Sequence, residues 1–349
     1  MRLLQLTPLL TAAIALCSCG GDESGDRGTT APPPAECTVA DVVLEDQSCL
    51  PPGVDVCAEG FVADGLGGCV AVLPPEPCPF GLMAVPGDEV CREVAPCGAA
   101  PWGDIPVEAS TQYVDASYAG TSTGSADQPW TSLQEAIEAA APGAIVALAT
   151  GVYPANLDVT KPVRLWGRCP TEVALDATGG LRFATGATGS ELRGMAVMGG
   201  AVFVSDATLL IEQAWLHDGG DFPIDLADEG APAEVTVRDS LIELARTYAV
   251  TVSGSVATLE RSEIRATQPN GAGLYGGGVQ ARVDPSTGVR ATVTLQGCHL
   301  SLHTEAGLSL FGADAIVRGT AIRDIAGSQQ LASGSAASLQ TLGAHRSNL

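Results

Sequence analysis

A six-residue pattern recurs through the second half of this chain. Each copy holds an aliphatic residue, two mostly polar residues, a small or inward-facing residue, any residue, and a second aliphatic residue. The copies begin at Leu192, Ile211, Val237, Leu259, Leu295 and Val317. Most steps between them are about nineteen to twenty-six residues, which is the length of one solenoid coil. Because alternate residues of a strand face opposite sides, we expect the aliphatic positions to fill a tube and their Arg and Glu neighbours to point outward.

One amphipathic helix is expected just before the first coils. Thr131 or Ser132 can cap its first turn, with Gln134 and Glu135 at capping-box spacing. Its apolar stripe consists of Leu133, Ala136, Ile137 and Ala140. Pro142 and Gly143 end it. A terminal coil needs a cap with a polar outer face, and this helix suits that task.

The same region resembles the entry of the pectin-lyase-like right-handed parallel β-helix superfamily. The matching segments are Tyr113-Val114-Asp115, Pro129-Trp130-Thr131, the helix, Pro142-Gly143 and Gly151-Val152-Tyr153. The resemblance implies an all-β fold, a right-handed parallel β-helix with an N-terminal capping helix, which we place over residues 101–327. It is specific for architecture and says little about chemistry, because function depends on sites carried by a fold.

Residues 1–19 resemble a bacterial lipoprotein signal. Arg2 gives a short basic region, an apolar run follows from about Leu9 to Leu16, and Leu16-Cys17-Ser18-Cys19 resembles a lipobox. We therefore expect Cys19 to be the lipid-bearing first residue of the mature chain, and Cys17 is a poorer candidate. The alternative is an ordinary cleaved secretory peptide. Either way the protein is expected to be exported.

Residues 20–36 are rich in Gly, Asp, Ser, Thr and Pro, and they have no apolar periodicity. They are expected to form a flexible tether that holds the folded part away from the membrane. Gly20 directly after the lipid-bearing cysteine favours the outer membrane by resemblance to the sorting rules of two-membrane bacteria. The expected location is therefore the cell envelope, with the lipid as membrane anchor.

The charge balance narrows the classes of partner. The formal net charge is -23, the pI is about 4.3, and Lys161 is the only lysine. Binding to nucleic acid or to anionic lipid through released counterions is therefore not expected. Aromatic residues make up only 4% of the chain, which weakens the case for an extended sugar-stacking groove.

Residues 37–100 are expected to form a small disulfide-rich module. Three similar units run from Cys37 to Cys49, from Cys57 to Cys69 and from Cys78 to Cys91. They hold little material for a core, and one disulfide closing a loop of this length contributes roughly 3 kcal/mol. Pairing within units is the simplest connectivity, although other pairings stay open. The segment has no Cys-x-x-Cys spacing, so we expect no metal site here.

Cys97 remains after these pairs. Its expected partner is Cys169, because Cys97 lies just before the solenoid entry and Cys169 in an early coil. Such a bond would clamp the module to the first coils. Cys298 then stays unpaired and is expected to pack inward, as free cysteines usually do.

Two irregularities break the period of the coils. One is the long step from Leu259 to Leu295, with Gln268–Gly271 and Asp284–Gly288, and the other runs from His217 to Gly230. The second contains Asp218, Asp221, Asp225, Asp228 and Glu229. Solenoids often carry recognition surfaces on inserted loops. A carboxylate cluster could bind calcium or perform acid/base chemistry, but the spacing matches neither an EF-hand nor a nonapeptide calcium repeat, so solvated loops are expected.

No catalytic residue can be transferred from the resemblance. The chain has no Gly-His-Gly with a following Arg-x-Lys and no Arg-x-x-Pro-x-x-Arg. His217, His299 and His303 are interpreted as surface or packing residues, and no cofactor is expected. The favoured hypothesis is a noncatalytic envelope lipoprotein that displays a β-helix surface to a protein or glycan partner. The alternative is a lyase or glycoside hydrolase acting on acidic polysaccharide.

The aliphatic rhythm stops after Ile325. Residues 328–349 are mostly Ser, Ala, Gly and Gln, with no recognisable strand or terminal helix. An open last coil exposes apolar side chains and strand edges. We therefore expect a disordered tail, and either a longer parent protein or a partner that covers this end.

Overall fold

The computed structural model describes residues 42–43, 49–50, 56–327, 334–341 and 345–349. The chain divides into two compact units, Met1–Pro52 and Gly53–Leu349. In the first unit, β1 (Val42–Val43) and β2 (Cys49–Leu50) pair antiparallel. The expected signal, the tether and the pairing of Cys37 with Cys49 fall on residues outside the described ranges. The described residues include no helix with the length and apolar character needed to cross a membrane.

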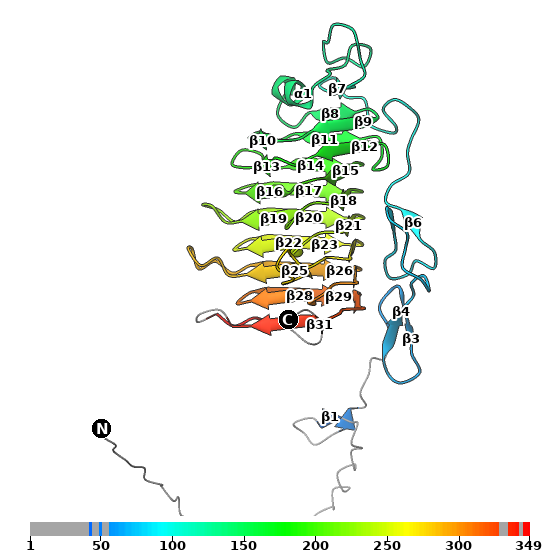
Figure 1. The fold of residues 1–349 in the computed structure, drawn as a ribbon, viewed down its shortest axis with the longest axis vertical. Coiled ribbons are helices and arrows are strands. Elements are labelled where there is room, and N and C mark those ends of the chain that lie inside the picture. Colours follow the sequence, from blue (N-terminus) through cyan, green and yellow to red (C-terminus); the bar gives the residue numbers. More distant parts are fainter. Residues whose placement is uncertain (1–41, 44–48, 51–55, 328–333, 342–344) are drawn as a thin grey trace, which may run out of the picture. The chain divides into compact units, whose positions relative to one another are not determined.

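The second unit contains three parallel sheets whose strands stack coil upon coil (Figure 1). Sheet 1 contains β7 (Gln112–Val114), β8 (Ile145–Leu148), β11 (Arg164–Gly167), β14 (Ser190–Arg193), β17 (Thr208–Glu212), β20 (Glu234–Arg238), β23 (Val256–Glu260), β26 (Thr292–Gln296) and β29 (Asp314–Arg318). Sheet 2 contains β9 (Gly151–Pro154), β12 (Val173–Asp176), β15 (Ala196–Met198), β18 (Trp215–His217), β21 (Leu241–Glu243), β24 (Glu263–Arg265), β27 (His299–Ser301) and β30 (Ala321–Arg323). Sheet 3 contains β10 (Leu157–Val159), β13 (Leu181–Phe183), β16 (Val202–Ser205), β19 (Ile224–Ala227), β22 (Tyr248–Ser253), β25 (Gly277–Arg282), β28 (Ala306–Phe311) and β31 (Ser335–Gln340). The expected parallel β-helix is thus the observed fold.

The six-residue pattern is the corner between sheet 1 and sheet 2. Its first aliphatic positions pair strand to strand in one row: Leu192, Ile211, Val237, Leu259, Leu295 and Val317. Its third positions all have left-handed backbone: Gly194, Gln213, Asp239, Arg261, Gly297 and Gly319. At the fourth position, the hydroxyl of Ser240 accepts from the Ala214 N–H, and that of Ser262 accepts from the Ser240 N–H. A small polar residue there therefore satisfies a buried backbone donor of the preceding coil.

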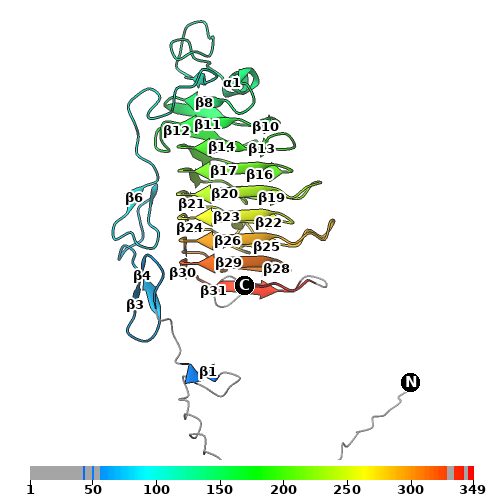
Figure 2. The same ribbon diagram turned by 180° about the vertical axis from the view of Figure 1, so that it is seen from behind.

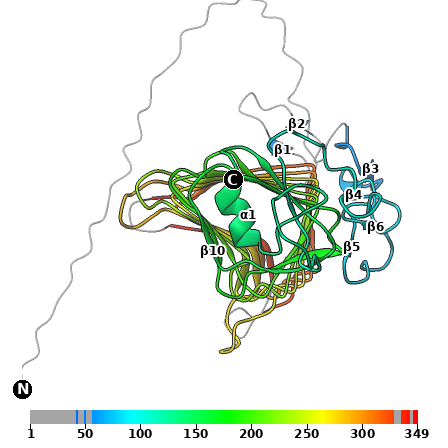
Figure 3. The same cartoon turned by 90° about the horizontal axis from the view of Figure 1, so that it is seen from above.

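The capping helix α1 (Leu133–Ala139) lies across the first coil when the solenoid is seen from above (Figure 3). Ser132 is its N-cap, and its hydroxyl accepts the Glu135 N–H at 3.4 Å. Leu133, Ala136 and Ile137 are buried against the core. Lys161 donates to the carbonyls of Glu138 and Ala140, so the only lysine in the chain supplies a cation at the helix C-terminus.

In the second unit, the cysteine-rich module contains two small antiparallel hairpins. These are β3 (Phe61–Ala63) with β4 (Cys69–Ala71), and β5 (Leu82–Met83) with β6 (Arg92–Glu93). The hairpins run beside the coils in both side views (Figures 1 and 2).

Three disulfides lie within the described residues. They join Cys57 to Cys69, Cys78 to Cys91 and Cys97 to Cys169, the pairs expected from the sequence. The third bond links the module to the early coil that carries Cys169. Cys298 is free and fully buried in the tube, where burial raises the pKa of its thiol to about 11.

The expectation that no strand follows Ile325 is wrong. β31 pairs parallel with β28, and Asn348 forms a β-bridge with Asp314. Strand pairing uses main-chain groups, so the small residues of Ser335–Gln340 can complete a coil without an aliphatic pattern. The expected disorder of 328–333 and 342–344 falls outside the described residues.

Candidate functional site

The two irregular segments lie on either side of sheet 3. Residues 217–223 precede β19 and residues 266–276 precede β25, whereas residues 228–233 and 283–291 follow these strands. Seen from above, loops project beyond the coils on either side of the sheet that contains β10 (Figure 3). The outer face of sheet 3 is therefore a surface that is bordered by a loop at each end of its strands.

The outward side chains on this face of sheet 3 form a continuous row. Successive strand pairs align Asp158, Arg182, Phe203, Asp225, Thr251, Gln280, Ser309 and Ser338. We call the part from β19 to β28 the loop-flanked face: Asp225, Thr251, Gln280 and Ser309, with Tyr248, Tyr275 and Glu305 at one end and Asp228 and Asp284 at the other. The Thr251 hydroxyl donates to Asp225, so neighbouring coils are joined by their outward side chains.

Two tyrosines meet at one end of this face. The ring centroids of Tyr248 and Tyr275 are 5.9 Å apart. Tyr248 lies over Gly277, where any Cβ would overlap its ring. Burial raises the pKa of the Tyr248 hydroxyl to about 12, and hydrogen bonds with Gln280 and Ser309 oppose that rise. Tyr275 is 37% exposed and has a left-handed backbone (φ 67°), so its loop holds an aromatic ring at the edge of the face despite local strain.

Glu305 stands beside the tyrosines. Its Oε2 atom is buried and finds no hydrogen-bond partner in the part of the chain that the structure describes. Burial raises the pKa of this carboxyl. A buried oxygen without a partner costs free energy unless something bonds to it, so this atom marks a place for an incoming polar group.

The interior behind this end of the face also holds polar atoms that lack partners. His303 is 1% exposed, and neither of its ring nitrogens, nor the Thr267 hydroxyl, makes a hydrogen bond within the described ranges. Burial lowers the pKa of His303 to about 3, so its ring is neutral at physiological pH. His303 is therefore a packing residue, as expected, and Gly278 leaves room for its Nε2.

The carboxylates at the other end already accept hydrogen bonds, Asp284 within its own loop and Asp228 from both loops. Asp284 accepts from the Ser286 hydroxyl and from two loop N–H groups, and these bonds lower its pKa to about 2. Asp228 accepts from the Gly230 N–H at 3.2 Å and the Thr287 hydroxyl at 3.0 Å. Their role in the structure is to hold the two loops together. Within the described ranges, the one set of three metal-capable side chains at ligand spacing is Cys97, Cys169 and Glu172, and its two sulfurs are joined in a disulfide.

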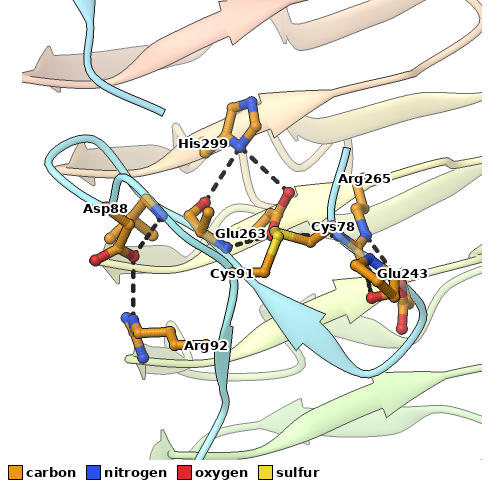
Figure 4. The surroundings of a disulfide bond; sticks show 11 residues. Cys78, Asp88, Cys91, Arg92, Glu243, Glu263, Arg265 and His299 are labelled. Carbon is orange, nitrogen blue, oxygen red and sulfur yellow. Dashed lines mark hydrogen bonds and ion pairs between the residues drawn. A yellow bond between two sulfur atoms is a disulfide. The ribbon is translucent and has the colours of Figure 1, made fainter. Parts of the chain in front are cut away.

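A second group of charged residues lies on the outer wall of sheet 2. Glu243, Glu263, Arg265 and His299 are only 2–4% exposed, and we call them the wall cluster (Figure 4). Arg265 donates to Glu243 from Nε at 2.8 Å and lies 3.6 Å from Glu263. His299 Nδ1 lies 3.2 Å from Glu263 Oε1. These residues occupy outward positions, as expected, but the cysteine-rich module covers them.

Comparison with known proteins finds few counterparts. No family model matches the chain, and no curated protein matches it. Among solved structures, one match is a pectate lyase, Pel9A, with 12% identity and a TM-score of 0.41 over 60% of this chain and 70% of the other. Another is a rhamnogalacturonan lyase, with 12% identity and a TM-score of 0.35 over 69% of this chain and 62% of the lyase, less than two thirds of its length. Such distant likenesses do not bear on activity. The three stacked parallel sheets themselves show that the chain is a parallel β-helix.

Proposed function

We propose that this chain is an exported, lipid-anchored protein of the cell envelope whose loop-flanked face binds a glycan without cleaving it. The observation that carries the proposal is the pairing of Tyr248 and Tyr275 beside the unpartnered oxygen of Glu305. An aromatic ring offers a flat apolar surface to the C–H face of a sugar, and the nearby polar groups can bond its hydroxyls. The half-buried Gln280 supplies a further polar group on the outer face of sheet 3.

Charge narrows the class of glycan. Four carboxylates lie on the face, those of Asp225, Asp228, Asp284 and Glu305, and its four strands contain one arginine, Arg282. A polyanion of uronic acids would meet like charges at close range, and such contacts are unfavourable. We therefore favour a neutral or amine-bearing glycan.

The anchor belongs to the same proposal. A lipid on Cys19 and a tether over 20–36 would hold the domain at the envelope, in our proposal at the outer membrane. The lipid would keep the binding face close to polymers of the cell surface.

A hydrolase is the second candidate, and one observation favours it. Glu305 has a raised pKa, the property that a general acid needs. A glycosidase also needs a second carboxylate opposite the first. Within the described residues Asp228 and Asp284 each accept two or more hydrogen bonds from the loops, whereas Asp225 accepts one, from Thr251, so this role would fall to Asp225.

The test is titration calorimetry of the mature chain with neutral, amine-bearing and uronic oligosaccharides, with new reducing ends and unsaturated products assayed in parallel. We expect binding of a neutral or amine-bearing sugar without turnover. Tyr275→Ala and Glu305→Gln should each weaken it by about five- to 150-fold, since losing a stacking or buried polar contact costs about 1–3 kcal/mol. Tyr118→Ala, a partly exposed tyrosine before the capping helix, is the matched control and should bind normally. Turnover that Glu305→Gln abolishes would replace this proposal with the hydrolase.

A further inference from the structure

The loop between Cys78 and Cys91 contacts the wall cluster through its main chain. The Gly81 N–H donates to Glu243 Oε1 at 2.9 Å, and the Ala84 N–H donates to Glu263 Oε2 at 2.8 Å. In the opposite direction, Arg265 Nη2 donates to the Pro79 carbonyl at 3.0 Å. His299 Nδ1 lies 3.2 Å from the Ala84 carbonyl. The docking of the loop on the wall cluster therefore depends on the shape of the loop backbone more than on the side chains of the loop.

Apolar contacts surround these bonds. Met83, Val85 and Val94 of the module pack with Leu241 and the partly buried Trp215 of the wall. Gly81 has a left-handed backbone (φ 79°), and a Cβ at this position would stand 3.2 Å from the Trp215 ring. A valine at Gly81 would therefore crowd the Trp215 ring and strain the left-handed backbone, and we expect it to weaken the docking of the loop.

Besides its disulfide, the loop has few bonds that hold its shape. Cys78 and Cys91 are 13 residues apart and close it, β5 inside it and β6 just after it are two residues each, and Asp88 accepts from the Val85 N–H and from Arg92. The solenoid does not share this dependence, because its coils hold one another through the parallel ladders of three sheets. The Cys97–Cys169 bond keeps the module attached to the early coils whether or not the loop is docked.

We propose that the Cys78–Cys91 loop is a latch over a second face of the solenoid. The disulfide holds the backbone in the form that matches the wall cluster, and without it the loop leaves the wall while the coils stay folded. Release uncovers Trp215, Leu241 and the two carboxylates together. The latch thus controls access to an aromatic and acidic surface separate from the loop-flanked face.

Imidazole acylation of the full mature chain, read by mass spectrometry, tests the latch. His299 is 4% exposed beneath the loop and His303 is 1% exposed inside the tube, so one reports on the latch and the other on the solenoid. In Cys78→Ser/Cys91→Ser we expect the labelling rate of His299 to rise roughly tenfold or more while His303 stays unreactive, as for a local opening. The matched control is Cys57→Ser/Cys69→Ser, which removes a staple of nearly the same span, 12 residues instead of 13. Its loop makes no hydrogen bond to the wall cluster within the described residues, so His299 should stay protected.

Gly81→Val tests the same latch with every disulfide intact, and it should also raise the labelling of His299. Protected His299 in both latch variants would overturn the proposal. So would equal labelling in the control, or labelling of His303 together with His299, because the solenoid itself would then be opening.

Discussion

Removing the Arg265 guanidinium from the wall cluster should lower the free energy of unfolding. Arg265 is 3% exposed and lies between Glu243 and Glu263, which are 3% and 2% exposed, so Arg265→Met leaves two buried carboxylates with no guanidinium. Breaking a buried ion pair by deleting one partner costs about 3–5 kcal/mol. The lost bond to the Pro79 carbonyl adds to that cost. We expect Arg265→Met to lower the free energy of unfolding by about 3–5 kcal/mol in urea denaturation.

The chain provides a matched control. Arg261 also bonds a carboxylate 22 residues earlier, Asp239, but its side chain is 53% exposed. Exposed pairs contribute about 0.2–1 kcal/mol, so Arg261→Met should cost no more than about 1 kcal/mol. Replacing Glu243, Glu263 and Arg265 together by methionine should recover part of the loss, because no buried charge is left without a partner. Equal costs for the two single arginine variants would refute the reasoning that burial sets the value of these pairs.

Three further predictions can be checked with the same preparation. His303 has a pKa lowered from 6.5 to about 3 in the folded state, so the unfolded chain binds more protons below pH 6.5. The free energy of unfolding should therefore fall by up to about 1.4 kcal/mol per pH unit as the pH falls toward 3. His303→Leu should lack this slope in urea titrations at pH 4, 5 and 7. Asp284 has a pKa lowered from 3.8 to about 2, so the stability from its loop bonds should be present above pH 3.8 and lost as pH falls through 2, and Asp284→Asn should show a flatter profile over that window. Labelling with a fatty-acid analogue should mark the exported chain and fail in Cys19→Ala; label that persists in the variant would contradict the proposed anchor.

The coils were predictable because their signal is local. Each six-residue copy contains its own inward residues, its own left-handed corner and a hydroxyl-bearing, small or inward-facing residue at the bend, as at Leu259, Arg261 and Ser262. A register of this kind repeats with every coil, so one sequence pattern specifies the tube. The capping helix was equally local, with Ser132 as cap and Leu133, Ala136 and Ile137 turned inward.

The wall cluster was not predictable because its partners are far away in sequence. Gly81 and Glu243 are 162 residues apart, and Ala84 and His299 are 215 apart. Sequence placed these charged residues on the outside of a strand, which is correct, but it gave no sign that a main-chain loop would cover them. A glutamate and an arginine two residues apart, as at Glu263 and Arg265, have the same pattern on an exposed strand.

The loop-flanked face was predictable only in part. The long steps pointed to inserted loops, and their placement beside one sheet follows from the strands that they join. The meeting of Tyr248 with Tyr275 beside Glu305 depends on where residues 266–276 place the Tyr275 ring relative to β22. No repeat pattern contains that information. The strand β31 was missed because main-chain pairing leaves no mark on its side chains.

Chemical footprinting of the tyrosines tests the central claim most directly. Tyr275 is 37% exposed at the edge of the loop-flanked face. Tyr118 is also partly exposed, and it is far from Tyr275 in the sequence. With a saturating neutral or amine-bearing oligosaccharide, nitration of Tyr275 should fall severalfold while that of Tyr118 is unchanged, because a sugar stacked on the ring blocks the reagent. Tyr275 that stays fully reactive while the oligosaccharide is demonstrably bound would contradict the account.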